Sequence, residues 1–235
     1  MATFFGIGVG PGDSELMTVK AVHTIEHLDI LYTPKAHRSG TSVAEQIAAP
    51  YFPESLMIKR RHFPMTNNWE EKRKSWQVIT DEIVADVKAG KNVGFVTLGD
   101  PSVYSTYSYL LDLIDNQVAI ETIAGISSFS QIAAEVSIPL TLDDELLEII
   151  PATADEQQIA KAIDVNDNIV IMKISTNLPK IYQLLKKRNL LTKALVISNA
   201  SMAKQKTFRL SEISPEDKLP YFSTVLVKKS GPVSG

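Results

Sequence analysis

Short apolar runs alternate with longer amphipathic stretches along the first half of the chain. The short runs are bounded by glycine, proline or charged residues, which is typical of buried strands, and they cover residues 2–9, 29–33, 55–59, 92–98 and 118–123. Between them, apolar positions recur at helical spacing over residues 14–28, 42–49, 68–89 and 103–115. We expect Asp13 or Ser14 to be the N-cap of the first helix. Strands that alternate with helices predict a parallel sheet covered on both faces.

The second half of the chain continues this alternation less regularly. A helix is expected over residues 127–136, then a loop over residues 137–145, and strands near residues 146–150, 168–174, 194–198, 205–209 and 222–228. The last two strands have no helix of useful length between them, which predicts a mixed sheet. We therefore expect an α/β fold of two α/β domains: residues 1–123 with an N-terminal parallel sheet, and residues 124–235 with a C-terminal mixed sheet.

Composition narrows the class of protein. The 235 residues are 44% apolar, enough for packed cores, and their formal net charge of −3 argues against a broad nucleic-acid-binding surface. The chain has no cysteine, which excludes disulfides, thiolate metal sites and a cysteine nucleophile. No apolar run approaches the ~18 residues of a membrane helix. The N-terminus lacks the basic segment of a signal peptide, so we expect a cytoplasmic protein with no membrane partner.

The histidines offer one spacing of the kind seen in metal sites. His23 and His27 lie four residues apart on an expected helix, but they lack the acidic neighbour of an H-E-x-x-H arrangement. We therefore expect no protein-bound metal.

A glycine-rich turn, GIGVGPGD at residues 6–13, follows the first expected strand. A dinucleotide fingerprint would have a third glycine where Pro11 stands and an acid after the second strand, whereas Asp29 precedes that strand. A Walker loop would have Gly-Lys-Ser/Thr where this chain has Gly12 and Asp13. An acid at a helix N-terminus also argues against a bound phosphate. A tight turn in which glycines permit close packing and Asp13 caps the helix is the simpler alternative.

A second turn of glycine and acid follows the fourth expected strand, in VTLGDPSVYSTYSYL at residues 96–110. In open α/β sheets, ligands bind at the carboxyl ends of the strands, which is where both turns lie. Asp100 and backbone carbonyls there suit a cationic, hydroxyl-rich ligand better than a phosphate. The alternative is that Asp100 caps the following helix and that the tyrosines are half-buried along one face of that helix.

These two turns resemble the tetrapyrrole methylases, together with AGISSFSQIA at residues 124–133, VIMKIS at residues 170–175 and VISNASMAKQ at residues 196–205. The resemblance covers the whole chain in the right order, and the combination of GxGPGD with GDPxxY is specific. It implies two α/β domains with a ligand cleft between them and a homodimer. It also implies S-adenosylmethionine as the methyl donor and a tetrapyrrole as the acceptor.

The resemblance also assigns candidate site residues. It implies that the donor contacts Pro11, Leu98, Gly99, Asp100, Val103, Ser127, Ser128, Met172 and Ala200. Asp100 would accept hydrogen bonds from the donor's ribose hydroxyls or amino group. After methyl transfer the acceptor carbon must lose one proton, and Asp100, Tyr104 and Tyr107 are the candidates to take it. For Met172, packing in the core is the alternative.

The stretch YTPK at residues 32–35 departs from the uroporphyrinogen methylases, which carry Tyr-Asp after the second strand. With FPMT at residues 63–66 and the second glycine turn, it is most similar to the branch of the family that methylates carbon 20 of precorrin-2 or cobalt-factor II. These substrates carry many carboxylates, so basic residues are expected to gather locally. We expect Lys35, Arg38, Arg60 and Arg61 to bind them, with solvated loop charges as the alternative.

Three other functions stay open. The first is another tetrapyrrole methylase of the corrin pathway. The second is an NAD(P)-binding oxidoreductase, and the third is a non-catalytic donor-binding module of the kind found fused to other enzymes.

Overall fold

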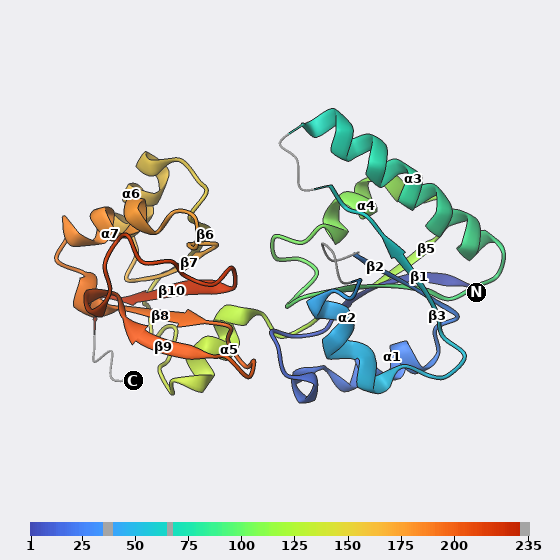
Figure 1. The fold of residues 1–235 in the computed structure, drawn as a ribbon, viewed down its shortest axis with the longest axis horizontal. Helices are drawn as coiled ribbons and strands as arrows, with labels where there is room; N and C mark the ends of the chain where they lie inside the picture. Colours follow the sequence, from blue (N-terminus) through green and yellow to red (C-terminus); the bar gives the residue numbers. More distant parts are fainter. Residues whose placement is uncertain (35–39, 65–67, 231–235) are drawn as a thin grey trace. The chain divides into compact units, whose positions relative to one another are not determined.

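The computed structural model describes residues 1–34, 40–64 and 68–230, and the chain divides into two compact units, Met1–Ser127 and Ser128–Gly235. The first unit is built on a five-stranded sheet, whose strands lie in the order β3-β2-β4-β1-β5 (Figure 1). All the strand pairs in this sheet are parallel. The strands are β1 Thr3–Gly8, β2 Ile30–Pro34, β3 Met57–Arg61, β4 Val93–Thr97 and β5 Ala119–Ile123.

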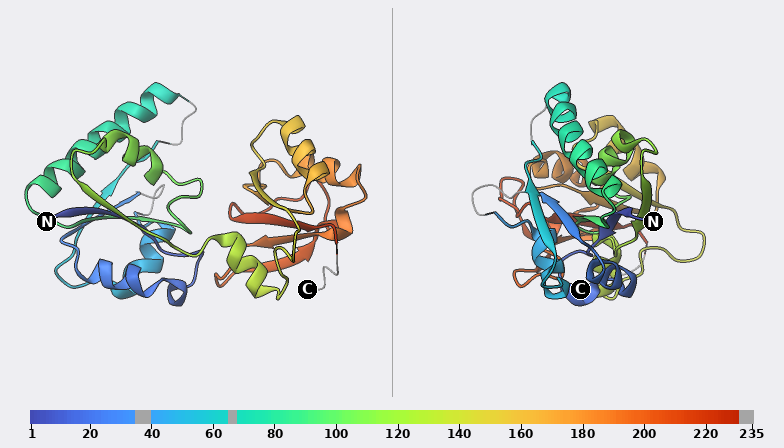
Figure 2. Two further views of the ribbon diagram at one scale, coloured as in Figure 1. Left: turned by 180° about the vertical axis from the view of Figure 1, so that it is seen from behind. Right: turned by 90° about the vertical axis from the view of Figure 1, so that its right-hand side faces the viewer.

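Helices cover both faces of this sheet, as Figure 1 and Figure 2 show. The α-helices are α1 Val19–Glu26, α2 Val43–Ala48, α3 Trp69–Lys88 and α4 Tyr107–Ile114, and η1 Ser14–Leu16 and η2 Ala49–Tyr51 are short 3-10 helices. Because alternate side chains of a strand point to opposite faces, Phe4 of β1 packs with α3 and α4, whereas Ile7 packs with α1 and α2. Burying each such side chain stabilises the fold by roughly 1.5–3 kcal/mol.

The second unit has a five-stranded mixed sheet in the order β6-β7-β10-β8-β9. Strands β6 and β7 are parallel, β10 is antiparallel to both β7 and β8, and β9 is antiparallel to β8. The strands are β6 Leu147–Pro151, β7 Asn168–Met172, β8 Ala194–Ser198, β9 Lys206–Arg209 and β10 Ser223–Lys228. The parallel first sheet and the mixed second sheet confirm the predicted fold class.

Helices also lie on both faces of the second sheet. They are α5 Ser128–Glu135, α6 Glu156–Val165 and α7 Leu178–Lys186, with the 3-10 helices η3 Leu191–Lys193 and η4 Leu210–Glu212. Helices α6 and α7 share a core with Ile169 and Ile171 of β7. On the other face, Ile132 of α5 packs with Leu195 and Ile197 of β8. Over the ranges that the structure describes, no helix is both long and apolar enough to cross a membrane.

Several predicted bounds were wrong, for local reasons. The helix expected over residues 14–28 is divided, because the Asp13 carboxylate accepts a hydrogen bond from Glu15 N (2.9 Å) and caps η1. Thr18 Oγ1 then accepts from Ala21 N (3.1 Å) and begins α1. The helix expected from residue 103 begins four residues later, after Tyr104, whose φ of 49° is left-handed. Strand β3 lies two residues further along than expected, which places Arg60 and Arg61 inside it.

Candidate active site

The two glycine turns are joined to each other at the carboxyl ends of β1 and β4. Gly99 N donates to Gly10 O (2.8 Å) and Gly10 N donates to Gly99 O (3.3 Å), in an isolated antiparallel bridge beyond the parallel strands. Both residues have left-handed backbone, with φ of 76° at Gly10 and 72° at Gly99, which glycine adopts without strain. A Cβ on Gly99 would have no atom nearer than Ile126 O at 4.0 Å. The second turn is therefore not crowded at Gly99, and it lies on the edge of the sheet where ligands bind in this fold class.

The end of β5 closes against the same turns. A Cβ on Gly8 would lie 2.6 Å from Gly125 N, and a Cβ on Gly125 would lie 2.2 Å from Gly99 O. Any side chain at Gly8 or Gly125 would force the backbones apart. These glycines therefore permit a direct backbone contact between three strand ends, and this packing role agrees with the simpler interpretation of the first turn.

Asp100 holds this arrangement together. Its Oδ2 accepts from Gly125 N (2.9 Å), and its Oδ1 accepts from Ser102 N (2.8 Å) and from the Ser102 hydroxyl. Desolvation raises the pKa of Asp100, but the hydrogen bonds from Ser102 and Gly125 outweigh it, so the pKa lies below its ordinary value. Asp100 does not cap α4, whose N-cap is Thr106 with no side-chain hydrogen bond. Its carboxylate instead bridges the β4–α4 turn to the end of β5.

The two candidate tyrosines lie in different surroundings. Tyr107 is 1% exposed, and its hydroxyl lies 2.7 Å from Thr122 Oγ1. Its ring fills the space beside Gly6, where a Cβ would lie 2.1 Å from a ring carbon. Burial raises the pKa of Tyr107. Tyr104, by contrast, is 47% exposed and lies four residues after Asp100.

The donor candidates are divided between the two units. Pro11, Leu98, Gly99, Asp100 and Val103 belong to the first unit and lie in or next to its two joined turns. Ser127 is the last residue of that unit, and Ser128, Met172 and Ala200 belong to the second. Met172 is the last residue of β7, and Ala200 is buried near the end of β8 beside Leu195.

The carboxyl ends of β7 and β8 are also irregular. Lys173, Asn199 and Ser201 all have left-handed backbone, with φ of 60°, 52° and 55°. Asn199 N donates to Phe222 O (2.7 Å), which ties the end of β8 to the start of β10. Strained non-glycine residues are more often found at ligand sites than elsewhere in a fold. The sequence predicted Met172 and Ala200 as donor contacts, but it did not indicate the left-handed backbone of the residues next to them.

The basic residues of β3 have carboxylate partners inside the first unit. Arg60 pairs with Glu45 of α2, with Nη2 2.5 Å from Oε1, and Arg61 pairs with Glu82 of α3, with Nη2 2.7 Å from Oε2. Both arginines therefore lie in a strand and not in a loop, and both have a carboxylate partner, although their side chains are partly exposed. Lys35 and Arg38, the other two predicted substrate contacts, lie outside the described residues.

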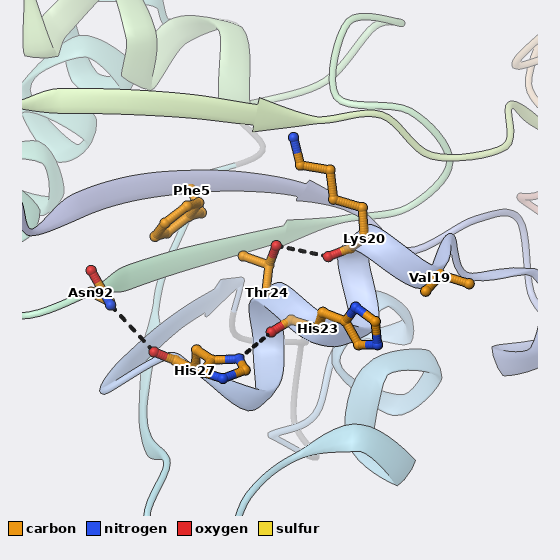
Figure 3. A pocket seen from close by; sticks show the side chains of 7 residues that line it. All are labelled: Phe5, Val19, Lys20, His23, Thr24, His27 and Asn92. Carbon is orange, nitrogen blue, oxygen red and sulfur yellow. Dashed lines mark hydrogen bonds between the residues drawn. The ribbon is translucent and has the colours of Figure 1, made fainter.

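A pocket lies beside α1 (Figure 3). Phe5, His23, His27 and Asn92 contribute to its wall, and Asn92 stands at the amino end of β4. His27 Nδ1 donates to the carbonyl of His23 (2.6 Å). Within the described part of the chain, no group of three or more histidines, cysteines or acids is placed to hold a metal ion.

Comparisons with known proteins place the chain in a family. A model of the Tetrapyrrole (Corrin/Porphyrin) Methylases matches residues 3–214. The chain is 38% identical to a cobalt-precorrin-2 C(20)-methyltransferase of Salmonella typhimurium, over 96% of this chain and 95% of that protein. It is 33% identical to a precorrin-2 C(20)-methyltransferase of a Sinorhizobium species, over 94% of this chain and 93% of that protein.

The fold has solved relatives as well. Uroporphyrin-III C-methyl transferase from Thermus thermophilus, complexed with S-adenosylhomocysteine, superposes with a TM-score of 0.69 at 18% identity, over 97% of this chain and 92% of that one. The two joined glycine turns thus stand in the fold of an α/β methyltransferase. The chain belongs to the tetrapyrrole methylase family, and the predicted resemblance is confirmed.

Proposed function

We propose that this protein transfers a methyl group from S-adenosylmethionine to carbon 20 of precorrin-2 or of its cobalt-containing form. The observation that carries the proposal is the pair of turns, GVGPGD and GDP, joined backbone to backbone at one edge of the first sheet. They occur in a chain that matches two C(20)-methyltransferases almost from end to end. The solved relative that holds S-adenosylhomocysteine supports the choice of donor.

The chemistry of the second turn fits a sulfonium donor. The low pKa of Asp100 keeps its carboxylate ionised at neutral pH, so the turn is negatively charged where a cationic ligand is expected. The absence of crowding at Gly99 is compatible with a ligand that approaches the backbone there. The donor's methyl group is already activated, and alignment with the acceptor carbon is the main contribution required of the protein.

We propose Pro11, Leu98, Gly99, Asp100, Val103, Ser127, Ser128, Met172 and Ala200 as donor contacts. For Asp100, the bonds to Ser102 and Gly125 orient the carboxylate. Its Oδ1 already accepts two hydrogen bonds from Ser102, whereas its Oδ2 accepts one from Gly125 and keeps a lone pair for a further donor. A second contact from the ligand is therefore compatible with its structural role.

We rank the candidates for proton removal from carbon 20 by their surroundings. The low pKa of Asp100 makes it a weak proton acceptor, and the hydroxyl of buried Tyr107 is engaged with Thr122. Tyr104 is 47% exposed, and we propose it as a proton relay: its neutral hydroxyl would receive the proton from carbon 20 only while releasing its own proton to water, and direct transfer to water is the alternative.

Methyl transfer is tested directly by incubating the protein with methyl-labelled S-adenosylmethionine and either precorrin-2 or its cobalt form. We expect label in the tetrapyrrole and a product heavier by one methyl group, located at carbon 20 by NMR. Uroporphyrinogen III serves as the control acceptor and should take up no label. Transfer to uroporphyrinogen, or to neither corrin precursor, would contradict the proposal.

A fluorescence titration with reduced nicotinamide cofactors separates this function from the oxidoreductase alternative, and we expect no saturable binding. The homodimer and the cytoplasmic location stay predictions, which size-exclusion chromatography with light scattering and cell fractionation would test.

A further inference from the structure

Arg60 is held rigidly at the carboxyl end of β3. Its Nε lies 3.1 Å from both carboxylate oxygens of Glu45, and its Nη2 lies 2.5 Å from Oε1. The carboxylate is almost fully buried, with 3% of its side chain exposed, whereas the arginine side chain is 43% exposed. The pair therefore has a buried end that fixes its position and an outer end that faces solvent.

Glu45 is unusual for its place in a helix. Ser42 caps α2 by accepting from Glu45 N (3.1 Å), and the spacing Ser-x-x-Glu favours a capping box in which the glutamate returns to the cap. Instead, Oε2 accepts from Thr33 Oγ1 (2.7 Å), and both oxygens accept from Arg60. Thr33 is fully buried and lies beside Arg60 in the register of β2 and β3. The carboxylate thus holds the arginine against the end of the neighbouring strand.

The outer side of the guanidinium is available. An arginine has five N–H donors, and the bonds to Glu45 involve only Nε and Nη2. Among the described residues, none accepts a hydrogen bond from Nη1. A half-exposed guanidinium oriented from behind by a buried carboxylate is well suited to bind a carboxylate of a ligand in two-pronged fashion.

Arg61 and Lys59 point to the other face of the sheet and have a different role. Arg61 Nε donates to Glu82 (2.7 Å) and Lys59 Nζ lies 2.6 Å from Asp86, both on α3. Both cations also lie over the ring of buried Tyr32, at 5.7 Å and 5.4 Å from its centroid. These contacts anchor α3 to the sheet, so we do not retain Arg61 as a substrate contact.

We propose that Glu45 is a positioning residue, which orients the guanidinium of Arg60 to bind a carboxylate of the polyanionic substrate. The inference rests on the proposed function, because that function supplies the polycarboxylate. The benefit is preorganisation: the arginine is already ordered before the substrate arrives, so less side-chain freedom is lost on binding.

The substitution Glu45→Gln tests the proposal, because the two explanations predict opposite changes in tetrapyrrole KM. It removes one negative charge near the substrate, so simple attraction would lower the tetrapyrrole KM, whereas loss of positioning raises it. We expect a rise of about threefold to tenfold in tetrapyrrole KM. The kcat and the donor affinity should be nearly unchanged. Glu82→Gln is the matched control, since it removes the same charge from the partner of Arg61, and its tetrapyrrole KM should not rise.

Variants of Arg60 test whether its guanidinium binds the substrate. Arg60→Lys keeps the positive charge but loses the paired N–H donors of the guanidinium, so tetrapyrrole KM should rise modestly. Arg60→Ala loses both the charge and the donors, so tetrapyrrole KM should rise by about tenfold. Because Arg60→Ala leaves a buried charge unpaired and risks unfolding, Glu45→Gln/Arg60→Gln provides an uncharged, hydrogen-bonded pair. In that double variant, tetrapyrrole KM should rise as in Arg60→Ala, with a Tm near that of the wild type.

The outcomes separate this inference from the proposed function. If the wild type transfers no methyl group to either corrin precursor, the proposed function fails. If the wild type is active but Glu45→Gln lowers tetrapyrrole KM or leaves it unchanged, Glu45 has no positioning role. An unchanged KM in the double Gln variant would overturn the role of Arg60 as well.

Discussion

At the scale of single residues, the glycines of the first turn act through close packing. Gly6 leaves room for the ring of Tyr107, and Gly8 meets the backbone of Gly125. Each glycine therefore has a partner that is distant in sequence, which a local motif cannot identify. Tyr107 also contacts residues that are distant in sequence. It was predicted as a candidate proton acceptor, and in the structure its side chain is buried in the core.

Asp100 allows a residue-scale prediction. Replacing it by alanine removes an acceptor from three hydrogen bonds, to Ser102 N, the Ser102 hydroxyl and Gly125 N. We expect the free energy of unfolding, measured with urea in the absence of donor, to fall by about 1–3 kcal/mol. Ser102→Ala is the milder control and should cost about 0.5–1.5 kcal/mol. Donor affinity measured by calorimetry should also weaken in Asp100→Ala if the carboxylate meets the ligand.

An Asp100→Ala variant as stable as the wild type would refute the structural bridge between the β4–α4 turn and the end of β5. If a folded Asp100→Ala variant binds the donor as tightly as the wild type does, Asp100 does not contact the donor and has only the structural role.

At the scale of elements, Glu145, which lies two residues before β6, is bonded to the start of β7 and the end of β10 in the second sheet. Its carboxylate accepts from Asn168 Nδ2 (2.9 Å) at the start of β7, from Lys228 Nζ (3.0 Å) at the end of β10, and from the Ser230 hydroxyl. These bonds, first that of Ser230 and then those of Asn168 and Lys228, lower the pKa of Glu145 from 4.5 to about 2. Lys228 is itself only 3% exposed. The carboxylate of Glu145 therefore compensates the charge of this buried ammonium group.

The sign of the pH dependence follows from that lowered pKa. The folded chain holds Glu145 ionised more strongly than the unfolded chain does, so its stabilisation is present above about pH 4.5 and is lost as the pH falls towards 2. We expect Glu145→Gln to have a lower Tm than the wild type at pH 7, and the gap to narrow between pH 4.5 and pH 2. Thermal unfolding followed by circular dichroism across this range is the measurement. A gap that is constant with pH would show that the charge of Glu145 does not stabilise the second unit.

At the scale of the whole molecule, the protein and its proposed substrate are both negatively charged. The formal net charge is −3, so binding of a polycarboxylate depends on local cations such as Arg60. Added salt shortens the range of such attractions from about 10 Å at 0.1 M to about 3 Å at 1 M. We expect tetrapyrrole KM to rise severalfold between 0.05 and 0.5 M KCl, while calorimetry gives a nearly constant donor affinity with one site per chain. A flat response of KM to salt would argue against a polyanionic acceptor bound by arginine.

The alternation of strands and helices, the parallel and mixed sheets, and the family could all be predicted from the amino-acid sequence. These features are encoded locally: apolar runs, glycines and caps occur within a few residues of the structure that they produce. The two turns could be found for the same reason, since each combines a strand end with glycine and acid in one short stretch. Bounds were missed where one cap interrupted a periodic pattern, as Thr18 does, or where a left-handed residue delayed a helix, as Tyr104 does.

The side chains that face one another could not be predicted from the sequence and became clear in the folded structure. The pairing of Arg60 with Glu45 depends on β3 and α2 meeting at one edge, across 15 residues of chain, whereas the Ser-x-x-Glu spacing by itself favours a helix cap. Arg60 and Arg61 have different partners because β3 ends two residues later than expected, which places both arginines inside the strand, and successive side chains of a strand point to opposite faces. Burial, hydrogen bonding and charge compensation depend on neighbours brought together by folding, and those neighbours are not adjacent in the chain.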